Sequence, residues 1–209
     1  MLAFGAVSEF AYVDAEPTWS NAYLWPALLK VLAGIDPAER RVFELGCGNG
    51  ATARLLARNG YSVTGVDPSA SGIAIAKKFE SERLHFEVGA TSDDLGGRFG
   101  TFPLVVSLEV IEHCPSAREF MRAFTSVLAP GGVGILSTPS HSYLKNLAVV
   151  ASGRFDHHFD PLWEGGHLKF FSTAKLRQLS DEFELRCELH RIGRIPVLAK
   201  SLLAVVRRN

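Results

Sequence analysis

The sequence predicts an α/β protein built on a doubly wound, mostly parallel sheet of seven strands. From residue 41 onward, short apolar runs alternate with segments of helical periodicity, a pattern typical of a sheet with helices on both faces. A glycine-rich turn at residues 46–50 follows the first apolar run. Of the 209 residues, 47% are hydrophobic and 21% are charged, a composition that supports one globular domain with a sizeable core.

The predicted strands are short apolar runs bounded by polar residues, proline or glycine. Five of them are expected before residue 140, at residues 41–46, 61–67, 84–89, 103–110 and 131–139. Two more runs should close the sheet, at residues 184–193 and 200–208. The polar, glycine-rich stretch at residues 91–102 is predicted to be a loop.

Helical periodicity follows most of these runs. Helices are expected at residues 50–60, 69–82, 116–129 and 173–183. The first of them should end at Gly60, because glycine commonly terminates helices. A further helix should precede the sheet, beginning at Ser20 and kinked at Pro26.

A long segment at residues 140–169 separates the fifth strand from the next helix. Insertions of this length are usually functional in compact domains, and Tyr143 and Trp163 make this one too aromatic for an idle linker. We therefore expect a single domain over residues 1–209 with four parts. These are an N-terminal helical cap at 1–40, a core at 41–139, a lid insertion at 140–169, and a C-terminal helix with closing strands at 170–209.

Charge and cysteine content exclude several classes of protein. Lys+Arg 22 against Asp+Glu 22 leaves no net charge, which argues against a nucleic-acid partner. The cysteines Cys47, Cys114 and Cys187 are widely spaced, as expected of free thiols in a reducing compartment, and they form no zinc motif. The apolar start of the chain lacks the basic residues of a secretory signal, and no run is long enough to span a bilayer. We expect a cytoplasmic monomer or homodimer without stable membrane insertion.

The glycine turn, Gly46-x-Gly48-x-Gly50, is suited to a ligand that approaches the backbone closely. Its spacing differs from the dinucleotide pattern, whose third glycine lies one residue further on. Glu44 lies inside the preceding strand and would repel a pyrophosphate, but it would favour a ligand with an ammonium group. Asp67 ends the second strand, where a carboxylate can bind both ribose hydroxyls; it could also cap the next helix, and the two roles are compatible. These features favour S-adenosylmethionine.

Four motifs occur in order: FELGCGNG, VTGVDPS, SLEVIEH and LAPGGVGILSTP. Together they resemble the class I S-adenosylmethionine-dependent methyltransferases over roughly residues 41–139. The resemblance implies that the glycine turn lies against the methionine part of the cofactor. The positions carried over to that role are Glu44, Gly46, Cys47, Gly48 and Gly50.

The same resemblance assigns the rest of the cofactor site. It implies that Asp67 binds the ribose and that Leu108 and Glu109 border the methyl group and the substrate. The adenine should lie near Pro68, Gly89, Ala90 and Thr91. Many members of the family have aspartate where this chain has Ala90.

Among methyltransferases, the stretch EVIEH and a later histidine before FFS resemble the ubiquinone-pathway O-methyltransferases. In those enzymes the corresponding group is implicated in binding a divalent cation. The resemblance implies that Glu109, Glu112 and His113 would bind it here. The simpler interpretation is that Glu112 and His113 start or cap the next helix. We favour it, and expect no bound metal. The adjacent His157 and His158 are read as exposed loop residues, because neighbouring residues rarely converge on one ion.

Methyl transfer to a hydroxyl requires a group that accepts its proton. Glu109, His113 and His141 follow the fourth and fifth strands, and we expect them to lie nearer the methyl group than His157 or His158. Histidine titrates near pH ~6.5 and an unshifted glutamate does not, so His113 is the preferred base or a cation ligand.

The sequence thus predicts a methyltransferase acting on a small molecule, at a hydroxyl oxygen. The alternatives are an N-methyltransferase and a non-catalytic cofactor-binding subunit with the same fold. A nicotinamide dehydrogenase is disfavoured by the missing third dinucleotide glycine. An RNA methyltransferase is disfavoured by the neutral charge.

Overall fold

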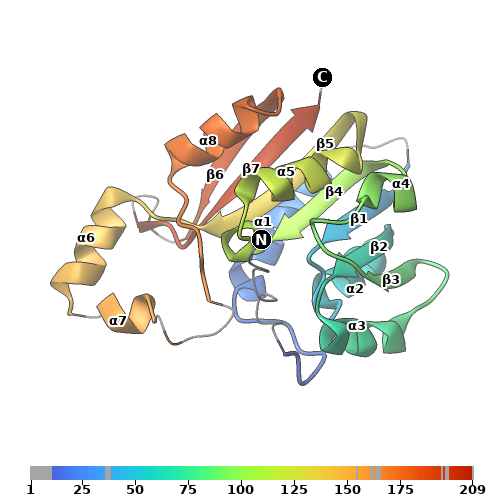
Figure 1. The fold of residues 1–209 in the computed structure, drawn as a ribbon, viewed down its shortest axis with the longest axis horizontal. Helices are drawn as coiled ribbons and strands as arrows, with labels where there is room; N and C mark the ends of the chain where they lie inside the picture. The colour runs from blue at the N-terminus through green and yellow to red at the C-terminus, as the bar shows by residue number, and fades with distance from the viewer. Residues whose placement is uncertain are drawn as a thin grey trace, which may run out of the picture.

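The computed structural model describes most of the chain (Figure 1). The described residues are 11–35, 39–153, 155–160, 162, 166–193, 195 and 198–208, without the side chains at 157 and 158.

One seven-stranded sheet forms the centre of the molecule, with strand order β3-β2-β1-β4-β5-β7-β6. Neighbouring strands among the first five are parallel, and β7 runs antiparallel to both β5 and β6. The strands are β1 Arg41–Leu45, β2 Ser62–Asp67, β3 Leu84–Val88, β4 Phe102–Leu108, β5 Leu128–Pro139, β6 Leu185–Ile192 and β7 Ser201–Arg208. The predicted fold class and all seven strands are confirmed.

Helices cover both faces of the sheet, because successive strand residues point to opposite faces and both sets are apolar. One face packs against α1 Asn21–Ala33, α2 Ala51–Arg58 and α3 Ala70–Ala76, which the short helix η1 Lys77–Phe79 continues. The other face packs against α4 Leu95–Phe99, α5 Ala117–Ser126 and α8 Thr173–Asp181. Pro26 lies inside α1, within the helix that the sequence predicts.

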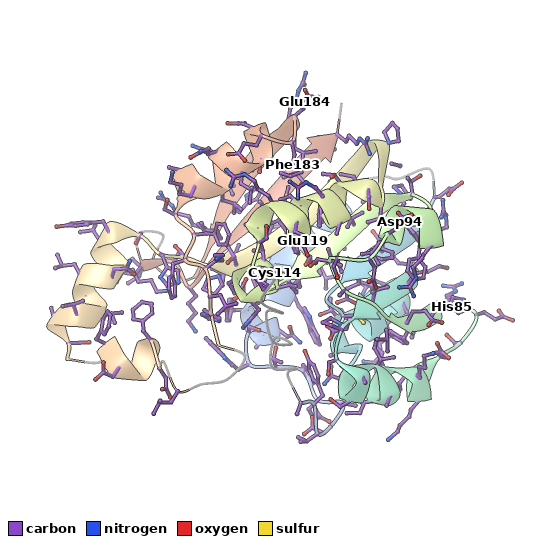
Figure 2. The ribbon with its side chains drawn as sticks, in the orientation of Figure 1. His85, Asp94, Cys114, Glu119, Phe183 and Glu184 are labelled. Atoms are coloured by element: carbon purple, nitrogen blue, oxygen red, sulfur yellow. The ribbon has the colours of Figure 1, made fainter. Side chains whose placement is uncertain are left out.

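The segment at residues 91–102 was expected to be a loop, and this expectation is wrong. It contains α4, because the Asp94 side chain accepts a hydrogen bond from the Gly97 amide at 2.9 Å and so caps the helix start. Leu95 is fully buried and anchors the helix to the core. Asp94 is labelled in Figure 2 at the start of this helix.

The insertion holds two helices, α6 Tyr143–Ala151 and α7 Phe155–His158, which lie at the left of Figure 1 away from the other helices. They follow β5 at the carboxyl end of the sheet, where ligands bind in open α/β folds. No described residue of α6 is buried. Among the described helices, none combines the length and the apolarity needed to cross a membrane. Trp163 lies outside the described residues.

Candidate functional site

The glycine turn between β1 and α2 has a left-handed backbone at three positions. Gly46, Gly48 and Gly50 have φ angles of 80°, 52° and 76°, which only glycine adopts without strain. The amides of Gly46 and Cys47 donate to the Val66 carbonyl at 2.7 and 3.1 Å and tie the turn to β2. A Cβ on Gly46 would collide with the side chain of Val110 after β4. The turn is therefore fixed at the point where β1, β2 and β4 end.

Glu44 lies in the middle of the sheet, one residue before the end of β1, and is 2% exposed. Burial, and secondarily the nearby Asp67 carboxylate, raise the pKa of Glu44 well above its ordinary value. Within the described part of the chain, its Oε2 has no hydrogen-bond partner. A buried carboxylate oxygen of this kind is costly unless a ligand donor or a proton satisfies it.

Asp67, the last residue of β2, is held from both sides. Its Oδ2 accepts from the Gly48 amide and its Oδ1 from the Ser69 amide, each at 2.8 Å. Ser69 is the residue that caps α3, since its hydroxyl accepts from the Gly72 amide. The N-cap residue of α3 is thus Ser69, while the Asp67 carboxylate braces both the glycine turn and the start of this helix.

The residues expected near adenine follow two neighbouring strands. Pro68 is exposed directly after β2, and the Gly89 amide donates to the Asp67 carbonyl at 3.1 Å, which joins the ends of β2 and β3. The Ala90 amide donates to Asp93 at 3.0 Å, and Asp93 pairs with Arg98 at 3.1 Å. Residues 89–91 thus lie beside Pro68 in a braced loop.

Glu109, directly after β4, combines backbone strain with a buried carboxyl group. Its φ is 56°, a value that non-glycine residues seldom adopt and that often marks a functional position. The Ser137 hydroxyl accepts from the Glu109 amide at 3.0 Å and donates to its Oε1 at 2.8 Å. The Ser201 hydroxyl donates to Oε2 at 3.3 Å. Burial raises the pKa of Glu109 to about 7 against the opposing effect of these two serines.

A hydrogen-bond chain connects Glu109 to the N-terminal helix. The Tyr23 hydroxyl lies 3.1 Å from Ser201 Oγ, and because Ser201 donates to Glu109, Tyr23 donates to Ser201. Burial and then Glu109 raise the pKa of Tyr23 to about 12. The Lys200 ammonium lies over the rings of Trp19 and Tyr23, at 5.2 and 5.1 Å. Tyr23, Ser137 and Ser201 were not predicted as site residues, and only a hydroxyl within an apolar strand marks the two serines.

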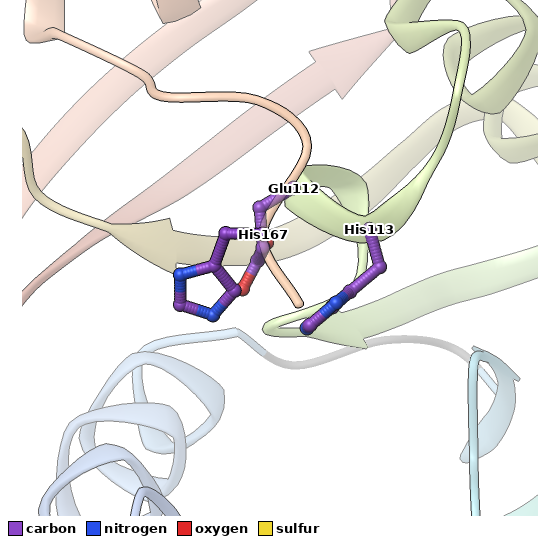
Figure 3. A group of neighbouring side chains, drawn as sticks. All are labelled: Glu112, His113 and His167. Atoms are coloured by element: carbon purple, nitrogen blue, oxygen red, sulfur yellow. The ribbon is translucent and has the colours of Figure 1, made fainter. Parts of the chain in front are cut away.

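Glu112, His113 and His167 form a second group, drawn in Figure 3, whose potential ligand atoms all lie within 4.8 Å of one another. Glu112 is fully buried, and neither carboxylate oxygen has a hydrogen-bond partner among the described residues. Burial, followed by Glu109, raises its pKa well above the ordinary value. The His113 and His167 rings meet edge to face at 4.9 Å. A carboxylate and two imidazoles at these separations can hold a divalent cation.

The placement of Glu112 and His113 differs in part from the simpler interpretation of the sequence. They lie in the short helix η2 Ile111–His113, whereas α5 begins at Ala117 behind its own cap, Ser116. His113 Nδ1 lies 3.2 Å from the Gly166 carbonyl oxygen, so a histidine-to-backbone contact is present as expected.

The returning end of the insertion brings His167 to this group. The amides of Leu168 and Lys169 both donate to the Glu112 carbonyl, at 2.8 and 2.9 Å. Glu109 is not part of the group, because its oxygens accept from Ser137 and Ser201.

His141 is nearly buried at the end of β5 and packs against aromatic rings of the insertion. Its ring lies 4.8 Å from that of Phe170 and 5.7 Å from that of Phe159. The Lys145 ammonium donates to the Ser140 carbonyl at 2.9 Å, and burial lowers its pKa despite the influence of Glu109. His157 and His158 lie in α7 and not in a loop as expected, and their side chains lie outside the described residues.

A sheet of this order, with a glycine turn and acidic residues at its carboxyl ends, is the architecture of a methyltransferase. The sequence profile of the methyltransferase domain family matches residues 19–190, and the chain belongs to this family.

The chain is similar to several proteins named ubiquinone biosynthesis O-methyltransferase. It is 33% identical over 149 residues to that of Xanthomonas axonopodis pv. citri (strain 306), covering 70% of this chain and 62% of the relative. It is 32% identical over 173 residues to the mitochondrial protein of Rattus norvegicus, covering 77% and 50%. It is 37% identical over 117 residues to that of Caulobacter sp. (strain K31), covering 54% and 46%. The chain thus spans about half to two thirds of the length of these relatives.

Solved structures share the fold at lower identity. The magnesium protoporphyrin IX methyltransferase of Synechocystis PCC 6803, solved with bound SAH, has a TM-score of 0.66 at 18% identity, covering 95% of this chain and 91% of that one. An S-adenosylmethionine dependent methyltransferase from Mesorhizobium loti has a TM-score of 0.68 at 21% identity, covering 90% and 99%.

Proposed function

We propose that the protein transfers the methyl group of S-adenosylmethionine to a hydroxyl oxygen of a small molecule. The observation that carries the proposal is the glycine turn fixed between two buried carboxylates, Glu44 and Asp67, at the carboxyl ends of β1 and β2. The names of the relatives support a hydroxyl acceptor. Three free cysteines support a cytoplasmic location.

The cofactor fits the charges of this site. S-adenosylmethionine carries an ammonium and a sulfonium but no phosphate, so two carboxylates attract it where they would repel a dinucleotide. The buried Glu44 oxygen that lacks a partner supports a role toward the ammonium end. Asp67 is the candidate residue for binding the ribose. Pro68 and residues 89–91 are the candidates for contacting the adenine.

We assign the proton-accepting role to Glu109. The sulfonium already activates the methyl group, so the protein has to hold the acceptor in line and take its proton. The preference for His113 rested on a glutamate of ordinary pKa, but burial raises the pKa of Glu109 to about 7, which suits a base at neutral pH. Ser137 and Ser201 orient its carboxylate. His113 and His141 remain the other candidates.

A divalent cation at Glu112, His113 and His167 would add to this chemistry. Both carboxylate oxygens of the buried Glu112 lack a partner among the described residues and lie beside two imidazoles, which favours the binding of a cation here. When bound, the cation would lower the pKa of the acceptor hydroxyl. With an accepted substrate, a chelator should then abolish turnover and magnesium should restore it, in parallel with loss of turnover in Glu112→Gln. Full activity in the presence of chelator would remove the cation from the mechanism.

Two measurements test the proposed function. Calorimetry should show micromolar binding of S-adenosylmethionine and of S-adenosylhomocysteine and no binding of NAD. A methyl-transfer screen with labelled cofactor against phenols, quinone precursors, carboxylates and amines should label the phenols or quinone precursors. Labelling of amines alone would favour the N-methyltransferase alternative, and binding of the cofactor without any transfer would favour a non-catalytic subunit.

A further inference from the structure

The N-terminal strap, residues 12–16, is hydrogen-bonded to the glycine turn, to α2 and to α3. The Asn49 amide nitrogen of the turn donates to the carbonyls of Asp14 and Glu16, each at 2.9 Å. The Arg54 guanidinium of α2 donates to the Ala15 carbonyl. At the other end, the Tyr12 amide donates to the Ser71 hydroxyl of α3 at 3.1 Å. Side chains of the turn and of α2 and α3 therefore fasten the strap.

The Tyr12 ring occupies a slot formed by two glycines. A Cβ on Gly48 would collide with the Tyr12 hydroxyl, and a Cβ on Gly72 would lie 2.8 Å from Tyr12 Cδ2. Gly72 lies in the first turn of α3, where glycine lowers helix stability by about 1 kcal/mol relative to alanine. Its missing side chain is explained by the room that the tyrosine ring needs.

The Tyr12 hydroxyl faces the acidic residues of the cofactor site. Burial, followed by the influence of Asp67, Cys47 and Glu44, raises the pKa of Tyr12 well above its ordinary value. The hydroxyl therefore keeps its proton at any physiological pH. It is a neutral hydrogen-bond donor beside the carboxylates that the proposed function assigns to the cofactor.

We propose that Tyr12 is a cofactor-contacting residue, which closes over bound S-adenosylmethionine while the N-terminal strap holds it there. This inference rests on the proposed function and deepens it. The strap runs from the glycine turn and α2 to α3, so it bridges the two sides of the Asp67 carboxylate. Trp25 Nε1 donates to Thr52 Oγ1 at 3.1 Å and joins α1 to α2 behind the strap. Cofactor exchange then requires the strap to detach, as lids do in other enzymes.

Dissociation of S-adenosylhomocysteine tests the inference without any methyl acceptor. Stopped-flow displacement should show that Tyr12→Ala releases the ligand about 10-fold faster or more than the wild type, with a correspondingly weaker Kd, as expected when a cover is removed. Tyr12→Phe should retain most of the slow release, since it keeps the ring. Thermal unfolding of each variant checks that it is folded.

A second variant loosens the strap and leaves Tyr12 in place. Asn49→Asp keeps the side-chain oxygen that accepts from the Ala51 amide at 3.2 Å, but it loses both donors to the strap. Like Tyr12→Ala, it should release S-adenosylhomocysteine faster than the wild type. His85→Ala removes an exposed ring from β3, outside the strap and the insertion, and should release the ligand at the wild-type rate.

The outcomes separate the two proposals. Wild-type release rates in Tyr12→Ala would overturn the inference and leave the proposed function standing. Tighter binding in Tyr12→Ala would also overturn it, because Tyr12 would then block the cofactor site. A wild-type protein that binds neither S-adenosylmethionine nor S-adenosylhomocysteine would overturn the proposed function and, with it, this inference.

Discussion

At the scale of single residues, Glu109 combines two energetic costs. Its φ of 56° is strained, and its carboxyl group is buried deeply enough to reach a pKa of about 7. Two serines from different strands, Ser137 on β5 and Ser201 on β7, hold the carboxylate. Strain and burial on one ionisable side chain, placed where the resemblance expects the methyl group, are typical of a catalytic group.

Substitution of Glu109 should separate it from His113 as the base. Glu109→Gln keeps the shape but cannot accept a proton, so turnover should fall by about 10²–10⁴-fold, the range for loss of a general base. Because Glu109 must be ionised, wild-type turnover should rise with pH through about 7. Initial rates with an accepted substrate, recorded between about pH 5.5 and about pH 8.5, measure both the loss of turnover and its pH dependence.

His113→Ala is the matched control for this prediction. In this variant turnover should still rise with pH through about 7, because Glu109 is still present. An unchanged rate in Glu109→Gln together with a large loss in His113→Ala would return the base to His113.

Asp67 gives a prediction about the cofactor rather than the acceptor. Asp67→Ala should weaken binding of S-adenosylhomocysteine by about 1–3 kcal/mol, the scale of lost charge-assisted hydrogen bonds. Because Asp67 also accepts from the amides of Gly48 and Ser69, Asp67→Asn should be compared with it. Calorimetry measures both variants. An affinity equal to that of the wild type would leave Asp67 with a role in holding the turn only.

At the scale of elements, the insertion stands out because helix α6 exposes apolar side chains. The apolar side chains of Leu144, Leu147 and Val150 on α6 are about half exposed, at 50, 51 and 55%. Exposed apolar groups at the carboxyl end of the sheet suit a cover that closes over ligand. Residues 140–169 and the helix around Trp19 and Trp25 should therefore become more protease-resistant when cofactor and acceptor bind. Cleavage in these segments that ignores both ligands would argue against a lid.

The element α4 shows where local sequence patterns are insufficient. Gly96 and Gly97 have poor helix propensity, so residues 91–102 read as a loop. Burial of Leu95 and the Asp94 cap stabilise the helix in spite of them. The strands and the longer helices were predictable because their apolar periodicity is strong and does not depend on distant contacts.

The site was predictable to the extent that its residues follow strands in recognisable motifs. The glycine turn and Asp67 meet because parallel strands end at one edge of the sheet. Tyr12, Tyr23 and Ser201 reach the site from segments remote in sequence, and no local pattern marks the two tyrosines. The pKa of Glu109 depends on burial in the folded protein, so it could not be predicted from the sequence.

For the whole molecule, buried carboxyl groups predict how stability depends on pH. Burial raises the pKa values of Glu44, Glu109 and Glu112. A raised carboxyl pKa means that the folded state binds the proton more tightly than the unfolded chain. The resulting stabilisation is present at low pH and is lost as pH rises; for Glu109 the window runs from its ordinary value of 4.5 to about 7.

Chemical denaturation at several pH values should therefore show a free energy of unfolding that falls across this window. Glu109→Gln should reduce the fall by roughly 3 kcal/mol, the scale of a shift from 4.5 to about 7 at about 1.4 kcal/mol per pKa unit. A pH dependence that is identical in the variant and the wild type would contradict the raised pKa of Glu109.

The position of β7 in the sheet has a consequence for the order of assembly. It is the last described strand along the chain, yet it lies between β5 and β6 and pairs with both. Its pairing with β6 is local, because Ile192↔Ser201 and Leu185↔Arg208 lie 9 and 23 residues apart (201 − 192 and 208 − 185). Its pairing with β5 joins residues 62 to 74 apart (201 − 139 and 207 − 133) and should form later. Pulse-labelling hydrogen exchange during refolding should therefore protect the amides that join β7 to β6 before those that join β7 to β5. During folding, then, the hairpin that carries Ser201 would form first, and the carboxylate of Glu109 would gain this partner only when the hairpin docks on β5.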